Sequence, residues 1–308
     1  MDFCIGEMEG DMATWQERLR SFALVGGLAS ASTLGCGKTA DTPKSDATPA
    51  VVSALGATVD ANGNPKMDSP AAVVNYDQPF GDAVHTEVLE GQELPRDGTA
   101  GGKKSGLLRA QIEDLWPRIK LTGAGNKPID YFFTVETAEG TIEIALRPEL
   151  APNHVRNILA LAKVGFYDGL SFERSVSQEA EVEGQKSRLD LLIAGCPNGT
   201  GDEGFGHIGY FVRAEFQPDV KHTAGTVGFW HEQDFDSAGT RFYITLGPAP
   251  ALDGKFTVIG NVSQGLDIVK RIAARPVKSA DPASPDNERP ILPTTIKKVS
   301  IHPEVMEK

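Results

Sequence analysis

The chain has 308 residues, of which 33 are glycine and 20 are proline, together about 17% of the sequence against about 12% in average proteins. Hydrophobic residues at 40% and aromatic residues at 7% are enough for a packed core, which excludes wholesale disorder, a collagen repeat and a coiled coil. The formal net charge of −12 repels phosphate backbones, so we do not expect nucleic acid as a partner. We expect one globular domain with appendages.

Residues 1–36 have the pattern of a signal peptide for export. Arg18 and Arg20 precede an uncharged run over residues 21–37, which is too short to span a bilayer. The residues before Met12 are acidic, the wrong sign for the start of such a signal, so we expect translation to begin at Met12.

The uncharged run ends in Thr33-Leu34-Gly35-Cys36, which resembles the lipobox of bacterial lipoproteins. The resemblance implies a lipid on Cys36 and a location in the cell envelope, where the protein would face the periplasm on a membrane anchor. An ordinary secretory signal with a chance cysteine is the alternative.

Two segments lie between this signal and the main globular region. Residues 37–77 are rich in Ala, Thr, Ser, Pro, Asp and Gly, which predicts a flexible linker. Residues 78–128 contain one helical signal, in which apolar residues recur at spacings of one to four before Pro117, namely Leu107, Leu108, Ile112, Leu115 and Trp116. We expect an amphipathic helix that packs on the main domain; a helix that binds a partner is the alternative.

Residues 129–306 predict a mainly β domain. Apolar and polar residues alternate on both sides of a turn at 138–140, which indicates a β-hairpin over 131–147. Helices are expected from Pro152 to Gly165, with one apolar face, and over 266–272. Short β-like runs lie at 189–194, 210–214, 226–230, 241–246, 256–262 and 294–301. About eight short strands, with helices near both ends, predict a closed antiparallel barrel capped by two helices.

A series of short motifs occurs in order along this region. They are Glu149-Leu150-Ala151-Pro152, Val155-Arg156-Asn157, Ala160-Leu161-Ala162, Gly165-Phe166-Tyr167-Asp168-Gly169-Leu170, Phe172-Glu173-Arg174, Gly195-Cys196-Pro197-Asn198-Gly199-Thr200-Gly201, Glu215-Phe216, His222-Thr223, Gly225-Thr226-Val227, Ser237-Ala238-Gly239-Thr240, Phe242-Tyr243-Ile244 and Leu252-Asp253-Gly254-Lys255. Over residues 131–303 the chain thereby resembles the cyclophilin-type peptidyl-prolyl cis-trans isomerases. The resemblance implies an eight-stranded barrel that binds proline-containing polypeptides and assists their folding by rotating X-Pro bonds.

Rotation about an X-Pro bond must overcome an amide barrier of about 20 kcal/mol. A cationic donor beside the prolyl nitrogen stabilises the twisted amide more than the planar one, and arginine suits this role because it stays charged. The resemblance places Arg174 at the position of the family's catalytic arginine. It places the substrate-binding groove at Leu191, Ile193, Trp230, His231, Arg241, Tyr243, Leu252 and Phe256.

Several groove positions depart from the family's pattern. Ile193 and Arg241 replace two glutamines, and Trp230-His231 replaces an Ala-Asn pair. An insertion after Arg174 carries acidic residues and is expected to be a solvated loop. Two interpretations remain open. In one, Arg174 and the apolar wall catalyse isomerisation and Arg241 replaces the lost amide donor; in the other, the protein is a catalytically weak or inactive binding or scaffold protein of the envelope.

Three further signals predict no additional site. The glycine pattern at 199–204 is that of a dinucleotide loop, but residues 205–209 are too glycine-rich to open the helix that such a loop needs. The histidines lack the paired spacing of a zinc site, and the cysteines (Cys4, Cys36 and Cys196) are too few for a disulfide framework. We expect no cofactor, no metal and no disulfide.

Overall fold

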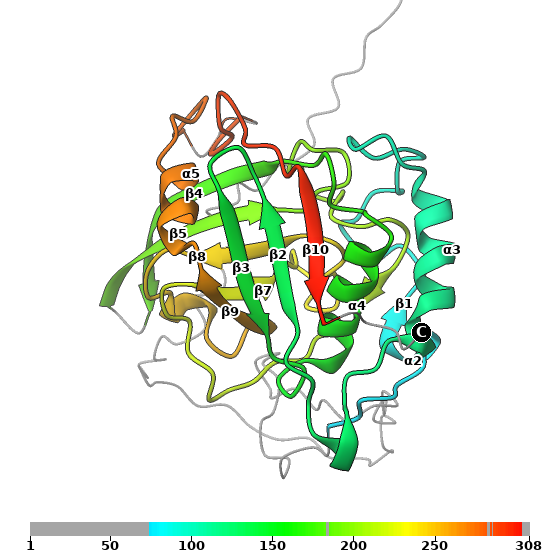
Figure 1. Ribbon diagram of the computed structural model, residues 1–308. Coiled ribbons are helices and arrows are strands. Elements are labelled where there is room, and N and C mark those ends of the chain that lie inside the picture. The colour runs from blue at the N-terminus through cyan, green and yellow to red at the C-terminus, as the bar shows by residue number, and fades with distance from the viewer. Residues whose placement is uncertain (1–73, 183–184, 282–283, 285, 304–308) are drawn as a thin grey trace, which may run out of the picture.

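The computed structural model describes residues 74–303 apart from 183–184, 282–283 and 285 (Figure 1). The predicted signal peptide, the lipid site at Cys36 and the linker up to residue 73 lie outside the described residues and stay predictions. The helices are α2 (Phe80–Ala83), α3 (Ser105–Leu115), α4 (Pro152–Lys163) and α5 (Leu266–Ala273), with 3-10 turns at Trp116–Arg118, Ala124–Asn126 and Pro250–Leu252. The strands are β1 (Val84–His85), β2 (Phe132–Glu136), β3 (Thr141–Leu146), β4 (Phe172–Val182), β5 (Gln185–Ala194), β6 (Phe211–Val212), β7 (Thr226–Phe229), β8 (Phe242–Thr245), β9 (Val258–Gln264) and β10 (Lys298–His302).

Eight strands form one antiparallel sheet in the order β10-β2-β3-β9-β7-β8-β5-β4. The predicted hairpin forms β2 and β3, where Phe133 lies opposite Ile144 and Val135 lies opposite Ile142. All four side chains are buried, because opposite residues of an antiparallel pair share one face. The mainly β fold predicted from the alternating pattern is therefore present.

The prediction of a closed barrel is wrong. The end strands β10 and β4 do not pair as strands in the described part of the chain, and the residues that precede them meet in an isolated bridge from Ser171 to Thr295. Beyond this bridge the edge of β4 bonds to a loop instead, since the amide of Ser175 donates to the carbonyl oxygen of Glu288 at 2.8 Å. The sheet is therefore a curled, open half-barrel.

Two other predicted segments also differ. The insertion after Arg174 is not a solvated loop, because it extends β4 and β5 into a ribbon in which Glu179 lies opposite Arg188. Opposite charges across an antiparallel pair favour such a ribbon. The strand predicted at 210–214 is the short β6, which pairs with β1 in a separate two-stranded sheet.

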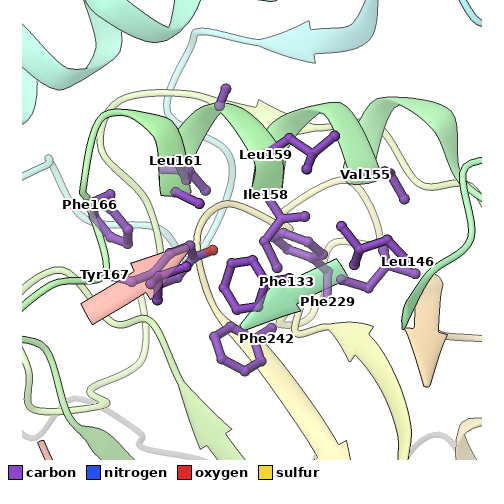
Figure 2. Packing of buried hydrophobic residues seen from close by; sticks show 14 of the residues in the cluster. Phe133, Leu146, Val155, Ile158, Leu159, Leu161, Phe166, Tyr167, Phe229 and Phe242 are labelled. Atoms are coloured by element: carbon purple, nitrogen blue, oxygen red, sulfur yellow. The ribbon is translucent and has the colours of Figure 1, made fainter. Parts of the chain in front are cut away.

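The main core lies between α4 and the sheet (Figure 2). Ile158 of α4 points towards Phe133, whose ring centroid lies 5.9 Å from that of Phe242 and 5.5 Å from that of Tyr167. Pro152 begins the helix, and the carboxylate of Glu215 accepts hydrogen bonds from two amides of its first turn at 2.9–3.1 Å. Both features are favourable at a helix N-terminus.

Residues 74–128 cover the outer face of α4, with α3 outside it in Figure 1. The helix predicted before Pro117 is present as α3, and it packs on the main domain through Leu108 and Ile112. The guanidinium of Arg156 in α4 donates to the carbonyl oxygen of Gln78 and lies over the ring of Trp116. The apolar core thus continues across residue 129, and the division into domains stays a prediction.

Candidate active site

Strand register places Arg174 in line with an apolar row on the outer face of the sheet. Arg174 in β4 lies opposite Ile193 in β5, Ile193 lies opposite Tyr243 in β8, and Tyr243 lies opposite Gly228 in β7. Residues that lie opposite one another project to the same face. The predicted catalytic arginine therefore shares a face with two predicted substrate-binding residues.

Buried apolar side chains on this face form a second cluster, here called the outer cluster. Its members are Val176, Leu189, Leu191, Ile193, Trp230, Tyr243, Ala249, Leu252 and Phe256. The centroid of the Phe256 ring lies 5.4 Å from that of Trp230 and 5.8 Å from that of Tyr243. The outer cluster thus contains six of the eight predicted groove residues, and the ring of His231 stacks on one of them, Phe256.

The outer cluster fills the slot, which is the part of the predicted groove that is expected to hold the ring of the substrate proline. Trp230 is 7% exposed and Phe256 is 6% exposed, whereas Tyr243 is fully buried. Of these three aromatic side chains, only Trp230 and Phe256 therefore retain any exposed surface. The slot is filled because Trp230 and Phe256 carry large aromatic side chains that contact each other.

A hydrogen-bonded chain holds the ring of Tyr243 in place. Its hydroxyl lies 2.8 Å from Nε2 of His222, and Nδ1 of His222 lies 2.9 Å from Asp253. Burial lowers the pKa of His222, and Asp253 opposes this effect. Gly228 leaves room for the ring, since a Cβ there would lie 2.3 Å from the Tyr243 hydroxyl.

Arg174 is partly buried between two loops. Its Nε donates to the carbonyl oxygen of Gly201 at 3.0 Å, and its Nη1 donates to the carbonyl oxygen of Asn287 at 3.2 Å. Burial lowers the pKa of Arg174, and the nearby charge of Arg241 lowers it further. Two of the five N–H donors are thus used by the backbone, and three are left for other acceptors.

One interpretation of the sequence expected Arg241 to replace the missing amide donor. The structure shows that it does not. Its Nε lies 3.2 Å from Oε1 of Glu173, and its Nη1 lies 3.9 Å from Glu232. The side chains of Arg241 and Glu173 are 3% and 1% exposed. Arg241 is therefore an internal counter-ion, directed to carboxylates rather than to the outer cluster.

His231 is also held by the protein itself. Its ring stacks on Phe256 with centroids 4.1 Å apart, while its two nitrogens lie 2.7 Å and 2.8 Å from the carbonyl oxygens of Glu232 and Lys255. Burial lowers the pKa of His231, and the two carbonyl oxygens oppose this effect. His231 therefore packs against the outer cluster through Phe256 and does not point to solvent.

Two contacts of the site lacked any sequence signal. Asn287 reaches Arg174 through its backbone carbonyl, which no side-chain pattern reveals. Glu232 accepts from the amide of Gly204 and from the side chain of Gln92, both at 2.9 Å. The segment before the β domain thus reaches the surroundings of the site through Gln92.

The described residues contain no cluster of three or more His, Cys, Asp or Glu side chains suited to a metal ion. Within residues 74–303, as far as they are described, no helix is both long and apolar enough to cross a membrane. Cys196 is buried with a free thiol, and burial raises its pKa to about 11.

Comparisons with known proteins identify the family. A family model described as cyclophilin type peptidyl-prolyl cis-trans isomerase/CLD matches residues 132–301. The peptidyl-prolyl cis-trans isomerase-like 1 of Rhizopus delemar is 36% identical over 139 residues, which are 45% of this chain and 77% of that protein. The isomerase CYP18-2 of Arabidopsis thaliana is 31% identical over 164 residues, or 53% of this chain and 92% of that protein.

A crystal structure of a cyclophilin-type isomerase from Cryptosporidium parvum is 20% identical, with a TM-score of 0.45, and the match covers 56% of this chain and 98% of that one. The family model covers more than half of the chain, and the Rhizopus relative is matched over more than two thirds of its length. This chain therefore belongs to the family of cyclophilin-type peptidyl-prolyl cis-trans isomerases.

Proposed function

We propose that this chain accelerates rotation about X-Pro bonds with Arg174 as the cationic donor. The observation that carries the proposal is the row in which Arg174, Ile193 and Tyr243 share one face of the sheet. In a planar amide the nitrogen lone pair is delocalised, whereas in the twisted amide it is localised and accepts a hydrogen bond. A donor aimed at this nitrogen therefore stabilises the transition state more than the ground state.

Arg174 has the chemical properties that this role requires. Although burial lowers its pKa, an arginine stays protonated at neutral pH because its ordinary pKa lies far above 7. Its guanidinium keeps three N–H donors beyond those bound by Gly201 and Asn287. The outer cluster supplies an apolar surface beside it, on which a prolyl ring loses contact with water.

A protease-coupled assay on a chromogenic X-Pro peptide tests the proposal with the wild type, Arg174→Ala and Arg174→Lys. We expect Arg174→Ala to lower kcat/KM about 100-fold, the size found when one transition-state donor is removed. Arg174→Lys retains the charge without the planar fork, so its rate should lie between the two. Background rates in both the wild type and Arg174→Ala would reject the proposal.

A second candidate function is binding of proline-containing segments without turnover. It is favoured by the direction of Arg241, which pairs with Glu173 and therefore does not replace the amide donor that the groove lacks. Binding is measured by NMR shift changes on addition of the same X-Pro peptide, and turnover by exchange spectroscopy on the peptide's cis and trans signals. Shift changes in the outer cluster with no acceleration of cis-trans exchange would support binding alone.

We also propose that the protein is exported in a bacterial cell, anchored to an envelope membrane by a lipid on Cys36, and acts on envelope or secreted polypeptides. Support comes from Arg18 and Arg20, the uncharged run after them and the lipobox-like end. Metabolic labelling with a radioactive fatty acid tests this in a bacterial host. We expect label in the membrane fraction for the wild type and none for Cys36→Ser; unlabelled wild type would contradict the anchor.

A further inference from the structure

The side chain of Arg174 is held by two loops that lie far apart in the sequence. Gly201, which accepts from Nε, belongs to the loop after β5, and Asn287, which accepts from Nη1, belongs to the loop between α5 and β10. The first loop approaches closely, since a Cβ on Gly201 would lie 3.2 Å from Cγ of Arg174. The direction of the guanidinium therefore depends on how these two loops sit relative to each other.

The second loop is also bonded to the part of β4 that follows Arg174. The carbonyl oxygen of Glu288 accepts from the amide of Ser175 at 2.8 Å, and its carboxylate accepts from Gln178 at 2.6 Å. Glu288 has a φ of 60°, an uncommon backbone conformation for a residue other than glycine. Burial together with these bonds holds Asn287 and Glu288 against the strand that carries Arg174.

One ion pair joins the two loops to each other. Nη2 of Arg289 contacts Oδ1 of Asp202, and Oδ2 of Asp202 accepts from the hydroxyl of Thr200 at 2.6 Å. Arg289 also lies 3.5 Å from Asp286. Asp286 belongs to the same loop as Arg289, so this pair does not connect the two loops. The Asp202–Arg289 pair therefore bridges the two loops whose carbonyl oxygens orient Arg174.

We propose that Asp202 and Arg289 are positioning residues, which fix the direction of the Arg174 guanidinium by holding its two acceptor loops together. The inference rests on the proposed role of Arg174 in X-Pro rotation. A donor stabilises a twisted amide only when it points at the nitrogen, and small errors in placement lower rates steeply. A loosened bridge should therefore lower kcat while peptide binding to the outer cluster continues.

Two variants with opposite changes in charge separate positioning from simple electrostatics. Asp202→Asn removes a negative charge near Arg174, whereas Arg289→Gln removes a positive one, yet each breaks the bridge. We expect both to lower kcat about tenfold with KM unchanged. Asp286→Asn is the matched control, because the ion pairs that it removes, to Arg289 and to Lys278, both lie within one loop, and it should leave kcat unchanged.

A second measurement does not depend on catalysis. The ¹H–¹⁵N signal of the Arg174 Nε–H, assigned by its loss in Arg174→Lys, reports the bond to Gly201 through its rate of exchange with water. We expect exchange at least tenfold faster in both bridge variants and unchanged in Asp286→Asn, with the urea midpoint measured for each variant to confirm folding.

The outcomes separate this inference from the proposed function. If Arg174→Ala slows the reaction but the bridge variants change neither kcat nor exchange, the inference is wrong and the proposed function stands. Changes in kcat of opposite sign, or faster exchange with unaltered kcat, overturn it as well. If Arg174→Ala has the wild-type rate, the proposed function fails, and positioning is then decided by exchange alone: faster exchange in both variants supports it, and unchanged exchange refutes it.

Discussion

The buried pair of Glu173 and Arg241 provides a quantitative test of the structure. The perturbation is Arg241→Met, which has a similar length and no charge. Both side chains are almost fully buried, and Oε1 of Glu173 also accepts the amide of Cys196 at 3.2 Å. The variant leaves the carboxylate of Glu173 inside the protein without its counter-ion.

Breaking a buried ion pair on one side costs about 3–5 kcal/mol of unfolding free energy, because the remaining charge is not compensated. Glu232 also loses a cationic neighbour, although it keeps the amide of Gly204 and the side chain of Gln92. The double variant Glu173→Gln/Arg241→Met removes both charges and keeps an acceptor for Cys196. Its loss should therefore be much smaller than that of Arg241→Met alone, by about 2 kcal/mol or more.

The pH dependence of the loss has a defined sign. Burial raises the pKa of Glu173 above its ordinary value near 4.5, while Arg241 lowers it, so removal of Arg241 raises it further. A carboxyl with a raised folded-state pKa favours the folded state below the unfolded value, and this stabilisation is lost as the pH rises through the folded value. Urea unfolding at pH 7 and pH 5 should show the larger deficit for Arg241→Met at pH 7. A deficit below about 1 kcal/mol at pH 7, or one that grows on acidification, would refute the reasoning.

Four further predictions concern the outer cluster and His222. Gly228→Ala should destabilise the fold by about 1–3 kcal/mol in urea unfolding, because its Cβ would overlap Tyr243, whereas Gly247→Ala, with open space around it, should stay within about 0.5 kcal/mol. Tyr243→Phe should cost about 1–3 kcal/mol, since Nε2 of His222 loses its partner. Because burial lowers the pKa of His222, an NMR titration should place it below 6.5, and this histidine should make the fold less stable as the pH falls through 6.5. Trp230→Ala should lower the KM for an X-Pro peptide by opening the slot, at a cost of about 3–5 kcal/mol, and an unchanged KM would contradict the filled slot.

Much of the candidate site could be predicted because its residues lie in short motifs. Leu252 is in a Leu-Asp-Gly-Lys turn, Tyr243 is in a Phe-Tyr-Ile motif, and Arg174 is in a Phe-Glu-Arg motif. Strand register then brings such residues to one face whatever their separation in sequence. The direction of Arg241 could not be predicted, because a buried arginine turns to whichever carboxylates the fold places nearby.

The sequence by itself determined the strands of the main sheet other than β4, the two helices that flank the β region and the family, since each depends on local periodicity or on ordered motifs. Only the tertiary structure decided whether the sheet closes and whether the slot is open. The sheet stays open because the loop around Glu288 bonds to β4 at the edge where β10 would have to pair. The slot is filled because Trp230 and Phe256, which lie 26 positions apart in the chain, contact each other within it. Both outcomes depend on long-range packing, which local pattern does not encode.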